Sequence, residues 1–160
     1  MSEIEAKLGI LLDGLKKKEQ ALAEIVSITE NQRTVIESGI PLAEVRAFIQ
    51  EMNQSKQEFI QVVKDCDTMF ENMLKEVGPQ LDARQDMYTS EVHELQKWIR
   101  RVMDLDVKIR VSEEENNRLI IALSPAPPPS QGLKPKPSGL PMDSSRVIKA
   151  YEQGAKGFKG

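Results

Sequence analysis

The stretch from residue 42 to residue 77 constrains the fold of this chain more than any other. Apolar residues recur along it at alternating steps of three and four, and the one charged member of the series is Lys56. A period of 3.5 residues places the series on one narrow face of an α-helix, like the a and d positions of a coiled coil. The series is Leu42, Val45, Ile49, Met52, Lys56, Phe59, Val63, Cys66, Phe70, Met73 and Val77.

Residues 2–38 carry a second series of the same period, which predicts a first long helix. It is followed by Ser38-Gly39-Ile40-Pro41. Glycine suits the left-handed residue just past a helix end, and proline suits the first turn of the next helix. A connection this short predicts that the first two helices fold back into an antiparallel pair. The series is Ile4, Leu8, Leu11, Leu15, Lys18, Leu22, Ile25, Thr29, Gln32 and Ile36.

The dipeptide Gly78-Pro79 allows two interpretations. Either the chain reverses there and a third helix begins, or one long helix is kinked there. The break is favoured, because proline removes a backbone hydrogen bond and crowds the preceding turn, while glycine leaves a helix easily. The sequence therefore predicts an all-α fold. It is an antiparallel up-down-up three-helix bundle, or coiled coil, with long helices at about residues 2–38, 41–77 and 79–123.

The third predicted helix is longer than the second. At 1.5 Å per residue, residues 79–123 would extend about 67 Å, against about 55 Å for the second helix. About two turns would then overhang the 38–41 connection, with the apolar residues of 119–123 uncovered. The predicted buried series is Leu81, Arg84, Tyr88, Glu91, Leu95, Trp98, Val102, Leu105, Ile109, Ser112, Asn116, Leu119 and Leu123.

The composition changes after residue 123. Residues 124–142 are rich in proline and predict an extended linker that ends the 1–123 bundle domain. Residues 143–160 form a short C-terminal segment, and a helix capped near Asp143 would place Val147, Ile148 and Tyr151 on one face. We expect the bundle to be followed by a disordered Pro-rich tail that carries this short amphipathic segment.

Charge and apolar content limit the classes of partner. The net charge is −3 with acids and bases interleaved, so no basic stripe is offered to nucleic acid. The longest apolar run, 119–123, is far too short to cross a bilayer. The chain begins without the basic and apolar blocks of a signal peptide, and it holds a single cysteine, so the cytoplasm is expected.

Residues that could carry chemistry are few. His93 is the one histidine, and the helix pattern places it on the solvent side. Cys66 falls in the apolar series and is expected to be buried and unreactive. The run Glu113-Glu114-Glu115 is interpreted as a solvated charge run, since adjacent helical side chains diverge. No catalytic residue, metal site or cofactor is predicted, and we do not expect an enzyme.

One pattern in the second and third helices consists of Met69-Phe70-Glu71, Tyr88, Leu95-Gln96-Lys97-Trp98-Ile99, Asp104, Val107-Lys108-Ile109 and Glu114-Glu115-Asn116-Asn117. This pattern resembles the FlgN-type flagellar export chaperones. The resemblance implies a small cytoplasmic helical protein that binds the helical termini of hook-filament junction proteins. Such a chaperone keeps these clients soluble and helps deliver them to the flagellar type III export apparatus, with its C-terminal part as the binding region.

Two hypotheses of function follow. The first is a flagellar export chaperone whose client covers the apolar end of the third helix and the apolar face of the tail. The alternative is a coiled-coil scaffold or adaptor that self-associates through the same surface and has no secreted client. A monomer that forms a one-to-one complex indicates the chaperone, and a stable dimer indicates the scaffold. The predicted partner-binding residues are Leu119, Ile120, Leu123, Val147, Ile148 and Tyr151.

Overall fold

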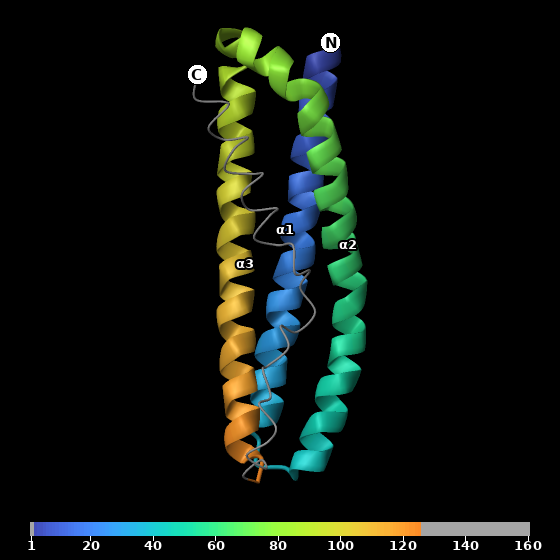
Figure 1. Ribbon diagram of the computed structural model, residues 1–160, viewed down its shortest axis with the longest axis vertical. Coiled ribbons are helices and arrows are strands. Elements are labelled where there is room, and N and C mark those ends of the chain that lie inside the picture. Colours follow the sequence, from blue (N-terminus) through green and yellow to red (C-terminus); the bar gives the residue numbers. More distant parts are fainter. Residues whose placement is uncertain (1, 126–160) are drawn as a thin grey trace, which may run out of the picture.

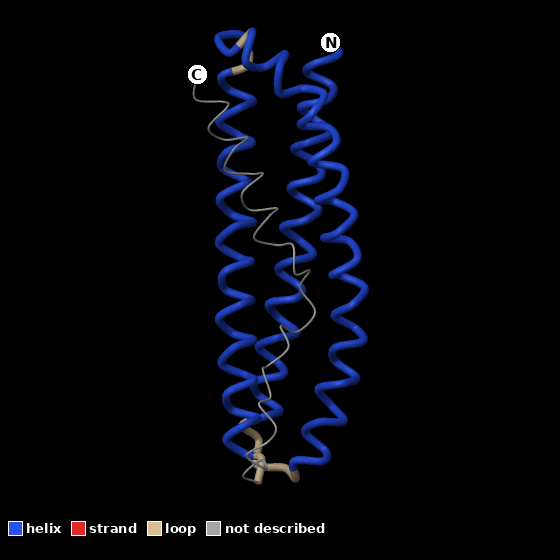
Figure 2. Tube along the Cα trace, in the orientation of Figure 1, coloured by secondary structure: helices blue, strands red, loops and turns tan. Residues whose placement is uncertain are grey.

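The chain folds into three long helices, shown in the tube of Figure 2. The computed structural model describes residues 2–125, except for the side chain of Gln85. Helix α1 spans Glu3–Ile36, α2 spans Leu42–Ala83 and α3 spans Thr89–Leu123, and a short 3-10 turn, η1, covers Gln85–Met87. No strand occurs in this part of the chain, which confirms the all-α prediction. The predicted linker and C-terminal segment lie outside the described residues, apart from Ser124 and Pro125.

The helices lie side by side along one axis (Figure 1). Helices α1 and α3 run in the same direction, and α2 runs against both. The backbone of α1 lies close to α2 and to α3, whereas α2 and α3 make far less backbone contact with each other. Helix α1 is therefore the central helix of the bundle.

The start of α1 and the first connection follow the local chemistry of the sequence. Ser2 precedes α1 in an extended conformation, and its hydroxyl accepts a hydrogen bond from the backbone N–H of Glu5 at 3.1 Å. In the connection from α1 to α2, Gly39 has φ of 82°, a left-handed value that favours glycine. The predicted turn at residues 38–41 is confirmed.

The predicted helix break at Gly78-Pro79 is wrong. Helix α2 continues through both residues to Ala83, and the chain reverses only at residues 84–88. The reason is packing, because Val77 and Leu81 are fully buried on the inner face while Pro79 faces solvent. Burial of two such side chains contributes about 1.5–3 kcal/mol each, which matches or exceeds the roughly 3 kcal/mol that an internal proline costs. Figure 1 shows that α2 bends toward α3 over its last turns.

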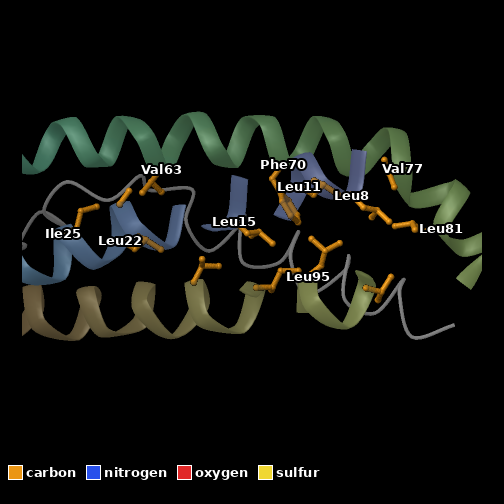
Figure 3. Packing of buried hydrophobic residues seen from close by; sticks show 14 of the residues in the cluster. Leu8, Leu11, Leu15, Leu22, Ile25, Val63, Phe70, Val77, Leu81 and Leu95 are labelled. Carbon is orange, nitrogen blue, oxygen red and sulfur yellow. The ribbon is translucent and has the colours of Figure 1, made fainter. Parts of the chain in front are cut away.

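Helices α1 and α2 bury the faces that the sequence predicts. All ten predicted positions of α1 are buried, and every predicted position of α2 is buried or half-buried. Apolar residues of both helices meet apolar residues of α3 in one cluster, part of which is drawn in Figure 3. The labelled residues are Leu8, Leu11, Leu15, Leu22, Ile25, Val63, Phe70, Val77, Leu81 and Leu95.

The predicted register of α3 is wrong in part. Trp98 and Leu105 are only half-buried, and Glu91 and Leu123 are exposed. The buried positions also keep alternating steps of three and four, but they include the charged residues Asp106 and Glu113. An apolar pattern cannot reveal such positions, because their burial depends on partners from other helices. The buried series of α3 is Val92, Leu95, Ile99, Val102, Asp106, Ile109, Glu113 and Asn116.

Candidate functional site

The predicted overhang of the third helix is absent. Because residues 79–83 belong to α2, α3 has 35 residues and nearly matches the 34 residues of α1. At the end of α3, Ser124 accepts a hydrogen bond from the Arg46 guanidinium at 3.3 Å, which places this end beside the first turns of α2. Figure 1 shows the end of α3 level with the α1–α2 connection.

The end of α3 nevertheless exposes apolar side chains. Leu119 and Ile120 are half-buried, while Ile121 and Leu123 are 50% and 51% exposed. These four residues are named the α3-end surface. Ile121 was not among the predicted binding residues, although its place in the apolar run 119–123 was a signal for it. The other predicted binding residues, Val147, Ile148 and Tyr151, lie outside the described part of the chain.

A buried polar layer crosses the bundle close to this end. The Lys56 side chain of α2 is 1% exposed, and its ammonium group donates to Glu113 of α3 at 3.1 Å and to Gln32 of α1 at 2.9 Å. The amide of Gln32 in turn donates to Asn53 at 2.7 Å. Burial lowers the pKa of Lys56, and the Glu113 carboxylate opposes this shift. The layer joins all three helices.

A second polar layer lies farther along the bundle. The Lys18 ammonium of α1 donates to Asp67 of α2. On α3, the Oδ2 atom of Asp106 lies 3.1 Å from the Arg110 guanidinium and forms an ion pair with it. The geometry does not make this contact a hydrogen bond for Oδ2. Burial raises the pKa of Asp106, with a smaller opposing effect from the charges of Arg110 and Lys18. Both layers connect helices inside the bundle, which is the arrangement of structural ion pairs.

The structure decides three sequence interpretations of possible chemistry. His93 is exposed and Cys66 is buried, as predicted, and burial raises the pKa of the Cys66 thiol, which disfavours the reactive thiolate. The prediction that residues 113–115 form a solvated charge run is wrong for Glu113, because this side chain is buried against Lys56. Glu115 forms an ion pair with Arg33 at 2.7 Å.

Charged pairs line the outer edge between α1 and α3. Glu19 pairs with Arg101, and Glu30 pairs with Lys108, each at 3.5 Å. The Trp98 ring on this edge lies beneath Arg101 at 4.5 Å and Lys16 at 5.6 Å. These side chains cover the seam between α1 and α3.

The outer edge between α1 and α2 is different. Its register is anchored by an ion pair of Lys7 with Glu76 at 3.5 Å, and by Gly14, where a side chain would collide with Met69. Because the two helices are antiparallel and share a seven-residue repeat, a step of seven residues forward along α1 is matched by a step of seven backward along α2. Repeating this step from the two anchoring pairs gives the neighbours farther down the edge. They place Ala21 beside Val62, Ile28 beside Ser55 and Val35 beside Phe48.

This edge is apolar and has an acidic border. Its exposed or half-buried apolar residues are named the α1–α2 flank, and Phe48 among them is 49% exposed. Exposed acids of α2 border the flank at a spacing of seven residues. Three of them lie three residues after the α2 positions 48, 55 and 62, which face this edge. The flank is Ile28, Val35, Phe48, Phe59 and Val62, and the acids are Glu44, Glu51, Glu58 and Asp65.

Comparison with known proteins gives no relative. No family model matches the chain, and neither a curated protein nor a solved structure matches it. Within residues 2–125, no helix is both long enough and apolar enough to span a membrane. No group of three or more His, Cys, Asp or Glu side chains in the same part of the chain is arranged to hold a metal ion.

Proposed function

We propose that this protein is a cytoplasmic export chaperone of the flagellar type III secretion system. Its clients are hook-filament junction proteins, whose helical termini it binds and keeps soluble until the export apparatus receives them. The proposal is supported by the resemblance in the second and third helices to FlgN-type chaperones. In this account the up-down-up bundle of residues 1–123 is a rigid body that presents a binding surface, and no catalysis is involved.

The observation that carries the proposal is the exposure of the α3-end surface. Ile121 and Leu123 are about half exposed at the terminus of a helix whose earlier heptad positions are covered by α1 and α2. An amphipathic client helix covers such residues by placing its own apolar face on them. Each Å² of apolar surface removed from water contributes about 25 cal/mol, so a client helix gains most where several such side chains adjoin.

The tail supplies a second contact in this proposal. Val147, Ile148 and Tyr151 follow the Pro-rich linker of residues 124–142. A second contact joined by a linker acts at a raised effective concentration, so its removal weakens binding without abolishing it. Truncation after Ser130 is expected to reduce client affinity by roughly tenfold, or about 1.4 kcal/mol.

The test compares two matched double substitutions on α3. Ile121→Asp with Leu123→Asp places charges on the α3-end surface. Val107→Asp with Val111→Asp changes two residues of the same helix that are 54% and 51% exposed but lie away from its end. Binding is measured by titration calorimetry against the terminal helical segments of the hook-filament junction proteins encoded in the same genome.

We expect the first variant to lose client binding and the second to retain it, with equal helical content by circular dichroism. Full affinity in the Ile121 and Leu123 variant would refute the α3-end surface as the site. No binding of any junction-protein segment by the unmodified chain would refute the client class. A chain that forms a stable dimer in the absence of client would favour the self-associating scaffold instead.

A further inference from the structure

We propose that the chain's own C-terminal segment, residues 146–153, docks onto the α1–α2 flank. In this docked state Val147, Ile148 and Tyr151 cover Phe48 and its apolar neighbours, and the basic side chains of the tail lie against the acids of α2. The inference concerns how the chain contacts itself, so it is independent of the partner proposed above.

The flank has the form of a site for a short amphipathic segment. Phe48 and Val35 lie beside each other at one end, and Val62 lies beside the small residue Ala21 four turns farther along α2. Along the described part of this edge from Gly14 to Val35, the ion pair that joins α1 to α2 is the buried one of Lys18 and Asp67, and none lies on the outer surface, in contrast to the edge between α1 and α3. An apolar strip of this kind, uncovered beside an acidic border, is complementary to a segment with one apolar and one basic side.

Charge favours this segment as the occupant. Residues 126–160 contain six Lys or Arg and two Asp or Glu, a net charge of +4. The other 125 residues contain 16 basic and 23 acidic side chains, a net charge of −7. No basic side chain of the described residues lies within ion-pair distance of Glu44, Glu51 or Glu58. Arg146 comes directly before the apolar triplet and Lys149 lies between Ile148 and Tyr151, so both can pair with these acids through their long side chains.

The linker is long enough to bring the tail to the flank. Ser124 accepts a hydrogen bond from Arg46, whose side chain points to a different side of α2 from Phe48, so the linker passes around the end of the bundle before it reaches the flank. From Arg46 to Val62 the rise along α2 is about 24 Å, at 1.5 Å per residue. A linker of 19 residues, 124–142, extends to about 59 Å in the polyproline conformation, so it reaches every part of the flank with length to spare. The tail therefore binds in cis at a high effective concentration.

Docking in cis has a consequence for partner binding under the proposed function. A client that uses Val147, Ile148 and Tyr151 must first displace them from the flank. The docked state also shields Phe48 from nonspecific contacts while no client is present. Reversal of the acids would therefore free the tail, while the α3-end surface would remain unchanged.

The test measures a distance within the full chain by pulsed electron spin resonance. Spin labels are placed at Gln54, on the solvent side of α2 beside the flank, and at Ala150 of the tail, in a Cys66→Ala background. Because two packed helices are about 10 Å across each, docking predicts a narrow distribution below roughly 25 Å. An undocked tail predicts a broad distribution centred near 30 Å or beyond, from the length of the intervening chain.

Charge reversal tests which residues hold the tail. We expect Glu51→Lys with Glu58→Lys to broaden the distribution, and Arg146→Glu with Lys149→Glu to do the same. Together the four substitutions should restore the narrow distribution. The matched control, Glu91→Lys with Asp104→Lys, reverses two exposed acids of α3 and should leave it unchanged.

Three outcomes would overturn the inference. The first is a broad distribution in the chain without charge reversal. The second is equal broadening by the α3 control, which would mean that total charge matters and the flank does not. The third is loss of the short distance on mixing with an excess of unlabelled chain, which would mean that the tail binds a second copy.

Discussion

The buried pair of Lys56 and Glu113 makes a strong prediction about stability. Their side chains are 1% and 7% exposed, and the described residues offer Lys56 one further acceptor, the Gln32 amide oxygen. Lys56→Met leaves a carboxylate buried without its counter-charge, and Glu113→Leu leaves an ammonium group with a neutral acceptor alone. Removal of one partner of a buried pair costs about 3–5 kcal/mol, whereas replacement of both by apolar residues is neutral or stabilises by about 1–4 kcal/mol.

We therefore expect each single variant to lose about 3–5 kcal/mol of unfolding free energy and the double variant to unfold at or above the urea midpoint of the unmodified chain. The assay is urea unfolding followed by far-ultraviolet circular dichroism, with the slope of each transition compared to check that unfolding stays two-state. Lys64→Met, at an exposed lysine of the same helix, is the control and should change stability by less than about 0.5 kcal/mol. If the double variant lost as much unfolding free energy as the two single variants together, Lys56 and Glu113 would not be a coupled buried pair.

Three further predictions use the same measurement of unfolding free energy. Phe70→Ala should cost about 3–5 kcal/mol because Phe70 is fully buried, and Phe59→Ala about half as much because Phe59 is half-buried; equal costs would contradict the packing. Gly78→Ala should stabilise by about 0.5–1 kcal/mol, since a Cβ there meets open space within a helix, while Gly39→Ala should destabilise because its backbone is left-handed. A lower free energy of unfolding in the Gly78→Ala variant would contradict a continuous helix at this position. Burial raises the pKa of Asp106 above its unfolded value, so its contribution to stability is complete below the unfolded pKa and is lost as pH rises through the folded pKa. Asp106→Asn should therefore raise the free energy of unfolding at pH 7 relative to the unmodified chain and change it little near pH 3. The reverse pattern across a pH series would refute the raised pKa of Asp106.

The sequence predicted the two helices whose buried faces carry a complete pattern. In α1 every predicted position is buried, including Lys18, Thr29 and Gln32, because the neighbouring apolar residues at steps of three and four fix the register of the whole helix. The same holds for Lys56 in α2. Periodicity was sufficient in these cases even where the residue itself was polar.

The errors in α3 have a single physical origin. Glu113 occupies an inner position because Lys56 pairs with it from α2, and Asp106 lies at an inner position where the charge of Lys18 on α1 acts on it; a pattern within one helix contains no information about such partners. The apolar pattern selected the large residues Trp98 and Leu105, which are half-buried, in place of the adjacent buried residues Ile99 and Asp106. Residues that pair across helices can be assigned only when the helices are placed together.

The error at Gly78-Pro79 also produced the error in the predicted site. Local backbone chemistry favours a break there, but burial of Val77 and Leu81 on the same face of α2 outweighs it. Assignment of the following residues to the third helix made that helix too long and created an overhang. Of the three binding residues predicted at this end, Leu123 is exposed while Leu119 and Ile120 are half-buried, because the matching helix lengths leave no overhang.

The mass of the protein in solution, alone and with a client, tests the proposed function most directly. Light scattering coupled to size exclusion is applied to the full chain and to the chain mixed with a hook-filament junction protein from the same genome. The account predicts a monomer of 18.0 kDa that converts to a one-to-one complex with the client. A dimer that forms without the client and does not bind it would contradict the account.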